Sequence, residues 1–152
     1  MTLNSVIKRI RDASLAHKQI ETFKFGRPTD FLTEKTLQFG AVFLQDNGGN
    51  IDNLSKTTSL NFKLYVLDLV NVSDEAKDNE TDVLSDSLSI AEDLIAILNH
   101  DSYTDWKFTS TNEFEFVIEK FDDLVGGVIV DITIQYPFLR DACAVPTTSP
   151  IV

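Results

Sequence analysis

Few side chains in this sequence of 152 residues could act as a thiol nucleophile or an imidazole base. Cys143 is the only cysteine, and His17 and His100 are the only histidines. Nucleophilic catalysis needs a serine or cysteine within reach of an oriented base. No glycine-rich or basic stretch surrounds Cys143 to activate its thiol, so we expect this small side chain to be packed away. Helix packing and capping account for both histidines. We therefore predict no catalytic residues and no enzymatic activity.

Metal and phosphate ligands also lack their usual spacing. Two distant histidines and one cysteine form no zinc pattern. The acidic side chains between residues 74 and 82 lack the glycine and the bidentate glutamate of an EF-hand, which favours a solvated acidic loop. The glycine pair at 48 and 49 leads into no helix and is neither a P-loop nor a Rossmann turn. We predict no metal site and no cofactor.

The length and composition fit one domain. A chain that is 43% hydrophobic and of this length can bury roughly 70% of the surface that it exposes when unfolded. Charges interrupt the apolar residues at its start, and nowhere do about 18 apolar residues follow one another. We expect a single domain over 1–152, with a globular core over 1–137 and an arm over 138–152, made in the cytosol without a membrane span.

The charge balance excludes one large class of partners. Acidic residues outnumber basic ones by 24 to 13, and the net charge is −11. Binding to nucleic acid needs clustered lysine and arginine, whereas the densest charge run here, over residues 73–86, is acidic. An acidic surface can let a DNA duplex pass without retaining it. Solubility alone would also explain the charge.

Two stretches have the periodicity of amphipathic helices. The first covers residues 3–20, with Thr2 or Asn4 as the N-cap. The second covers residues 83–99, with Asp82 or Ser85 as the cap. Its apolar stripe consists of Leu84, Leu88, Ala91, Ile95 and Leu98. We expect both helices to pack against a sheet.

The remaining patterned stretches predict strands. Residues 21–25 alternate briefly, and residues 37–46 are apolar on both faces. Asn47-Gly48-Gly49-Asn50 then predicts a hairpin turn into a long strand over 59–72, in which one face is apolar. Residues 73–81 predict a polar loop.

The last third of the chain predicts more strands. Short alternating runs lie within 106–120, with Phe114, Phe116 and Ile118 on one side. We expect a turn over 122–127 that leads into the last strand, which Pro137 ends. The apolar face of that strand comprises Val128, Val130, Ile132, Ile134 and Tyr136. The order of elements predicts an α+β domain, with a mainly antiparallel sheet, two amphipathic helices packed on one face and an extended C-terminal arm.

The hairpin tip over 46–58 and the arm can both reach a neighbour. We predict interface residues in the two segments: Phe138, Leu139, Arg140, Asn47, Gly48 and Gly49. Exposed strand edges pair with other chains, and a contact that repeats head to tail closes a ring when the rotation is right. Burial of a phenylalanine such as Phe138 contributes about 1.5–3 kcal/mol. A structural subunit that forms a ring is the function that this pattern favours.

Several short motifs resemble the neck and tail-completion proteins of tailed bacteriophages, and more narrowly the tail-terminator type found in phages of Bacteroidetes hosts. The resemblance covers about residues 20–147 and rests on Leu84-Ser85-Asp86 with Asp93, on Phe121-Asp122-Asp123-Leu124-Val125-Gly126-Gly127, and on Asp131-Ile132-Thr133-Ile134 with Pro137-Phe138, Cys143 and Pro146.

The resemblance implies an α+β subunit of a homo-oligomeric ring between the head connector and the tail. The ring would contact neck proteins on one side and tail proteins on the other, and DNA would only pass through its lumen. The resemblance does not fix the number of subunits, for which we expect a hexamer or dodecamer. It implies a place in the virion after assembly in the host cytoplasm, and no catalytic residues.

Two other functions stay open. An acidic protein-binding adaptor, or an inhibitor that mimics DNA, would also be rich in carboxylates. A small enzyme with an unfamiliar site would show a polar pocket.

Overall fold

The computed structural model describes residues 1–31, 37–70, 77–100, 105–109, 111–120, 124–138, 140, 143 and 145–148, with only the backbone of residues 77, 78 and 120. These residues form an α+β fold with three helices and a mixed, mostly antiparallel sheet of six strands. The helices are α1 (Leu3–Ala16), α2 (Pro28–Phe31) and α3 (Lys77–Leu98). The strands are β1 (Thr22–Phe25), β2 (Ala41–Asp52), β3 (Thr57–Leu69), β4 (Lys107–Phe108), β5 (Phe114–Lys120) and β6 (Leu124–Pro137).

The sheet has the strand order β1-β2-β3-β6-β4, and β5 also pairs with β6. Only β1 and β2 run parallel among these pairs. The short β4 pairs with Gln135 and Ile134 of β6, whereas β5 pairs with residues from Val130 back to Leu124. Both strands therefore follow the same side of β6, and the sheet ends in β1 on its other side.

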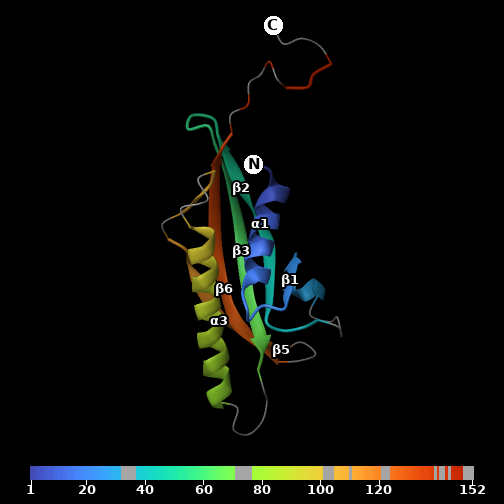
Figure 1. Ribbon diagram of the computed structural model, residues 1–152, viewed down its shortest axis with the longest axis vertical. Coiled ribbons are helices and arrows are strands. Elements are labelled where there is room, and N and C mark those ends of the chain that lie inside the picture. The colour runs from blue at the N-terminus through green and yellow to red at the C-terminus, as the bar shows by residue number, and fades with distance from the viewer. Residues whose placement is uncertain are drawn as a thin grey trace.

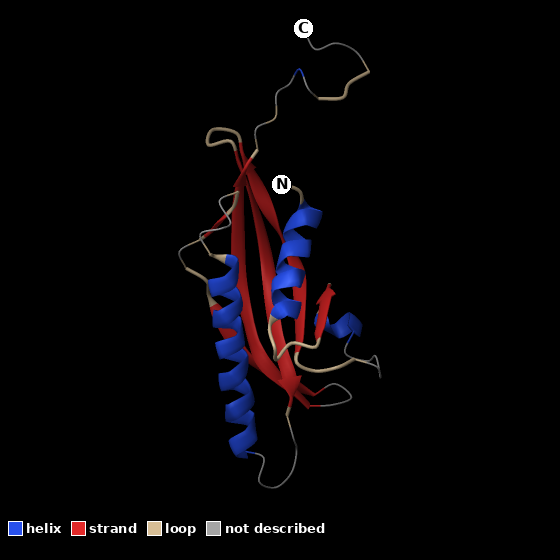
Figure 2. Cartoon of the chain, viewed as in Figure 1, coloured by secondary structure: helices blue, strands red, loops and turns tan. Residues whose placement is uncertain are grey.

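Helices α1 and α3 cover one face of the sheet (Figures 1 and 2), and one apolar core joins them to it. The alternation of β3 and β6 produces this core, because residues two apart in a strand point to the same face. From the central strands it takes Phe62, Leu64, Val66, Val128, Val130, Ile132 and Ile134. From the helices it takes Val6, Ile10, Ala13, Ile90, Ala91, Leu94 and Leu98. The predicted shared faces of these two strands are confirmed.

Helix α1 begins where the sequence predicts and ends earlier. Thr2 is its N-cap, and a capping box links Thr2 and Ser5: each side chain accepts a hydrogen bond from the backbone N–H of the other residue. The helix ends at Ala16, so the predicted extension to residue 20 is wrong. His17 already has extended backbone angles and donates its N–H to the carbonyl of Ser14.

Helix α3 is longer than its apolar stripe. It begins at Lys77, so residues 77–81 are helical and not part of a loop; residues 73–76 lie outside the described residues. Asp82 and Ser85 lie inside the helix and do not cap it. The hydrophobic pattern locates only the turns that pack on the sheet, and the polar turn before Val83 gives no such signal. The side chains that it buries most deeply are Val83, Ser87, Ile90, Ala91, Leu94 and Leu98.

The glycines of 47–50 form a bulge and not a hairpin turn. Strand β2 continues to Asp52, and the turn lies at residues 53–56. The register with β3 shifts between Asp46 and Gly49. Gly48 has a φ of +76° and donates its N–H to the Asp46 carboxylate, while a Cβ at Gly49 would lie 2.0 Å from the carbonyl oxygen of Ser59. Gly48 is thus needed for its positive φ, and Gly49 is needed for the close approach of β3 within the ladder.

Two further expectations near the C-terminal end are wrong. Gly126 and Gly127 lie inside β6 and not in a turn. A glycine is needed at position 127 because β3 approaches too closely for a Cβ there. Residues 121–123 lie outside the described residues. Cys143 is exposed and not packed away. Its described neighbours along the chain, from Arg140 to Thr148, are exposed as well, so they offer it no core.

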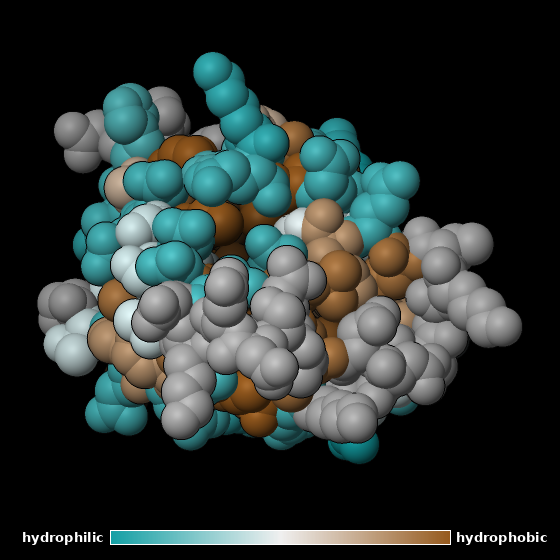
Figure 3. All heavy atoms as spheres, turned by 90° about the horizontal axis from the view of Figure 1, so that it is seen from below, coloured by the Kyte–Doolittle hydropathy of each residue, from teal (hydrophilic) through white to brown (hydrophobic). Residues whose placement is uncertain are grey.

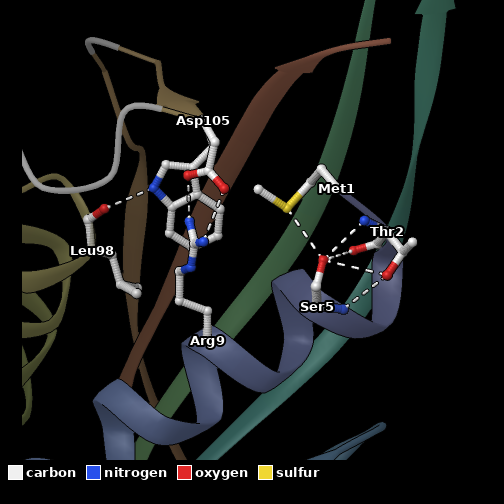
Figure 4. A network of polar contacts seen from close by, with 7 residues as sticks. Met1, Thr2, Ser5, Arg9, Leu98 and Asp105 are labelled. Carbon is white, nitrogen blue, oxygen red and sulfur yellow. Dashed lines mark hydrogen bonds and ion pairs between the residues drawn. The ribbon is translucent and has the colours of Figure 1, made fainter. Parts of the chain in front are cut away.

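An exposed ion pair fastens α1 to the segment before β4 (Figure 4). Arg9 donates to both carboxylate oxygens of Asp105, at 2.9 and 3.0 Å, and its guanidinium lies 4.5 Å from the centre of the Trp106 ring. The Trp106 indole donates to the carbonyl of Leu98 at the end of α3. This group of side chains ties both helices to the start of β4.

Replacing Asp105 by asparagine should lower the free energy of unfolding by at most about 1 kcal/mol, since the carboxylate is more than half exposed. The hydrogen bonds from Arg9 lower the pKa of Asp105 in the folded state. Its contribution is therefore complete above the unfolded pKa and disappears as the pH falls through the lowered folded pKa. Urea unfolding of both proteins at neutral and acidic pH measures this. A difference that stays constant or grows on acidification would contradict it.

Candidate interaction surface

One end of the sheet carries the hairpin turn between β2 and β3 and the end of β6 (Figure 1, top). The Asp52 side chain organises the turn, because it accepts from the N–H groups of Leu54 and Ser55 at 2.8 and 3.3 Å. The hydrogen bond from the Ser55 side chain and these backbone bonds lower the pKa of the Asp52 carboxyl. Lys56 takes a φ of +53°, which reverses the chain into β3. The turn is thus held by local polar contacts.

Phe138, a predicted interface residue, packs on this turn within its own chain. Its N–H donates to the carbonyl of Lys56 at 2.9 Å, and the Lys56 ammonium lies 5.7 Å from the centre of its ring. The pairing of Thr57 with Pro137 brings the two segments together. Arg140 is exposed, and Leu139 lies outside the described residues. Phe138, the residue that follows β6, is therefore fixed to the hairpin end.

Two apolar side chains stand out from this polar end. Leu54 is 98% exposed in the turn, and Ile51 is 68% exposed in the last part of β2. Within the tip over 46–58 the sequence pattern predicted Asn47, Gly48 and Gly49 as interface residues and did not single out Leu54 or Ile51. The available signal was their apolar type within a run of Asp, Asn, Ser and Lys. Covering such apolar side chains with a partner removes them from water and so stabilises the contact.

The other predicted interface residues, Asn47, Gly48 and Gly49, are exposed but lie apart from the turn at residues 53–56. They belong to the part of β2 that extends beyond Leu44, where the pairing with β1 ends. β3 separates them from β6 in the sheet. The hairpin end therefore unites Phe138 with the turn, while the bulge glycines lie along the side of β2.

The sheet face away from α1 and α3 has its own hollow of about 430 Å³. Tyr65 lies in it and donates its hydroxyl to Gln45 at 2.9 Å. Burial raises the pKa of Tyr65, Lys63 opposes this, and the carboxylates of Glu115, Asp131 and Glu119 add to it. Other lining residues are Arg27, Pro28, Thr29, Leu67, Val117, Glu119, Val125 and Ile129. The described residues that line the hollow are both polar and apolar, and none of them is a histidine or cysteine.

This open face also carries charged side chains of both signs. Lys63 pairs with Asp131 at 3.3 Å across β3 and β6, and Glu115 and Glu119 follow on β5. At the end of the molecule opposite the hairpin turn, apolar patches alternate with hydrophilic side chains (Figure 3). The open face thus combines an apolar cluster around Phe43 and Leu67, against which Phe31 packs, with acidic side chains along β5.

His17 and His100 follow the ends of α1 and α3, and Cys143 lies in the chain after β6; residues 74–76 of the acidic run lie outside the described residues. His17 contacts Asp93 of α3, with 3.1 Å between the imidazole Nε2 and the carboxylate, and this pair joins the two helices. Nowhere in the described residues do three or more His, Cys, Asp or Glu side chains gather in a way that could hold a metal ion. None of the described helices is long and apolar enough to cross a membrane.

Comparisons with known proteins identify no family. No protein-family model matches this chain, and no curated protein matches it.

Proposed function

We propose that this protein is a structural subunit of a tailed-phage virion, a ring-forming tail terminator or neck protein that joins the head connector to the tail. The α+β fold agrees with what the resemblance implies. Two helices on one face of the sheet and a C-terminal arm are the finer features of this proposal. Its partners are further copies of the chain, six or twelve in a ring, and adjoining neck and tail proteins.

The observation that carries the proposal is the hairpin end. It places Leu54 and Ile51, which are 98% and 68% exposed, beside the point where Phe138 starts the arm. Burying such side chains against a neighbour contributes about 25 cal/mol for each Å² of apolar surface covered. A turn that local hydrogen bonds hold in place can present them without further ordering cost. We assign this end to contacts with the adjoining ring or subunit.

The open face of the sheet is the side that suits the lumen. Helices α1 and α3 pack on the opposite face, and a net charge of −11 disfavours retention of a passing duplex. Glu115, Glu119 and Asp131 lie on the open face. The place of action in this proposal is the virion neck, after assembly in the host cytoplasm.

The mass of the purified protein in solution tests the ring. Light scattering over a range of concentrations should give six or twelve subunits, and deletion of residues 138–152 should shift the protein toward monomers without unfolding it. Circular dichroism of the truncated protein provides the control for folding. A truncated chain that assembles as the full chain does would contradict the role of the arm. A full chain that is monomeric throughout would favour the acidic adaptor.

A substitution at the hairpin tip makes a second test. Leu54→Asp should leave the free energy of unfolding of the monomer within about 0.5 kcal/mol, because surface substitutions rarely cost more. It should prevent the stacking of the ring on its partners or on a second ring, as seen by sedimentation. Asn53→Asp adds the same charge at the neighbouring turn position and serves as the control. Equal behaviour of the two variants would remove Leu54 from the interface.

A further inference from the structure

The two lateral sides of the sheet have complementary edges. β1 forms one side and β5 lies along the other side of β6. Phe25 of β1 is 43% exposed, and Phe114 and Phe116 of β5 are 51% and 50% exposed. Every large aromatic side chain that is exposed among the described residues therefore belongs to one of these two edge strands.

The faces of the two strands match in chemistry. On β1, Phe23 and Phe25 share the face of Val42 and Leu44, toward the helices, while Lys24 points to the open face. On β5, Phe114 and Phe116 share the face of Val130 and Val128, also toward the helices. Glu115 and Glu119 point to the open face with Ile129 and Val125. Each edge strand thus has aromatic side chains on the face toward the helices. On the open face, β1 carries a basic residue and β5 carries acidic residues.

On both edge strands, the backbone groups that point outward, away from the sheet, belong to the same kind of residue. Thr22 donates its N–H to the carbonyl of Gly40, just before β2, and Gly26 donates its N–H to the carbonyl of Leu44, within β2. Because alternate residues of a strand bond to opposite sides, the groups of Phe23 and Phe25 point away from β2.

On β5, the bond from the Asp131 N–H to the Glu113 carbonyl marks the odd-numbered residues as those that bond to β6. The groups of Phe114 and Phe116 then point away from β6. Each edge strand therefore presents its outward N–H and C=O groups at phenylalanine positions.

We propose that β1 of one copy pairs antiparallel with β5 of the next copy, and that this contact joins neighbouring subunits. The strand directions allow it. Both β1 and β6 run parallel to β2, and β5 runs antiparallel to β6. Strands β1 and β5 of two copies in the same orientation are therefore antiparallel. The register that aligns all these features pairs Phe25 with Phe114, Lys24 with Glu115, and Phe23 with Phe116.

The contact is heterologous, since each copy uses β1 on one side and β5 on the other. It therefore repeats head to tail and closes a ring when the rotation between copies is right. It combines main-chain bonds with aromatic and opposite-charge cross-strand pairs. The proposal rests on the ring assembly proposed above and names the surface that builds it.

Cysteine cross-linking between two different variants tests the register. In a Cys143→Ser background, Lys24→Cys and Glu115→Cys are prepared separately, mixed and oxidised. These positions form a pair without main-chain bonds, with Cα atoms about 4.5 Å apart, which lies within the range that a disulfide spans. Covalent dimers should form in the mixture and in neither variant alone. Lys63→Cys mixed with Asp131→Cys, an ion pair within one chain, is the control and should give none.

Charge reversal supplies a second readout. Lys24→Glu or Glu115→Lys alone should raise the concentration at the midpoint of assembly by about tenfold, a change of about 1.4 kcal/mol, and the double variant should restore it. Light scattering separates the two proposals. A ring without cross-links or charge rescue would overturn the edge contact alone. Cross-linked chains that grow without closing would overturn the ring and keep the contact. A protein that stays monomeric and gives no cross-links would overturn both.

Discussion

Replacing Leu64 by alanine should lower the free energy of unfolding by about 2–5 kcal/mol. Leu64 lies in the middle of β3 with none of its surface exposed, within the core that both helices share with the sheet. Removing its three terminal carbon atoms loses their transfer free energy and leaves a cavity that the paired strands on either side cannot collapse to fill. Such a loss is a large part of the stability of a domain of this size.

The same substitution at Leu54 is the matched control. Leu54 is 98% exposed in the hairpin turn, so Leu54→Ala should change the stability of the monomer by about 0.5 kcal/mol or less. Urea unfolding followed by circular dichroism, at a concentration at which both variants are monomeric, measures the two values. Similar losses at the two positions would show that this core does not hold the domain together.

Gly127→Ala should lower the free energy of unfolding by about 2–4 kcal/mol. An added Cβ would lie 1.9 Å from the carbonyl oxygen of Val66 and 2.9 Å from its carbonyl carbon. These are main-chain atoms of the longest strand pairing in the sheet, between β3 and β6. Relief of the clash must therefore separate two strands that carry much of the core, because no side chain can rotate away.

Gly126→Ala is the control for this second substitution. Its added Cβ would meet the side-chain carbon Cγ2 of Val70 at 3.0 Å, and Val83 and Ile118 at 3.5 and 3.6 Å. Side-chain ends can move by a few tenths of an ångström, so the loss should stay near 1 kcal/mol or below. Thermal unfolding of the two variants compares them directly. A larger loss at Gly126 than at Gly127 would argue against the close approach of β3 and β6.

Periodicity located the two central strands, β3 and β6, because burial on one face is a local property of the sequence, whereas β2, predicted over 37–46, begins only at Ala41. The apolar residues at 60–66 and 128–136 alternate as the two central strands require, and both strands lie where these residues predict. Glycine was harder to interpret. The pairs at 48–49 and 126–127 both suggested turns, yet each lies inside a strand, because glycine serves a tight strand approach as well as a turn.

The ends of the helices show the same limit. Thr2 and Ser5 form the capping box that starts α1, and a capping side chain is visible in the sequence. The extension of α3 back to Lys77 has no apolar signal, since those turns lie before the part that packs on the sheet. The predicted interface was likewise divided: Phe138 joins the turn, whereas Gly48 lies along β2.

The sequence by itself determined the α+β class, the apolar faces of β3 and β6 and the acidic charge, because composition and alternation are local and additive. Only the tertiary structure decided which strands became the lateral edges of the sheet and which side chains meet across it. The exposure of Phe25 and of Phe114 depends on strand order, and strand order results from long-range pairing that no short stretch of sequence specifies.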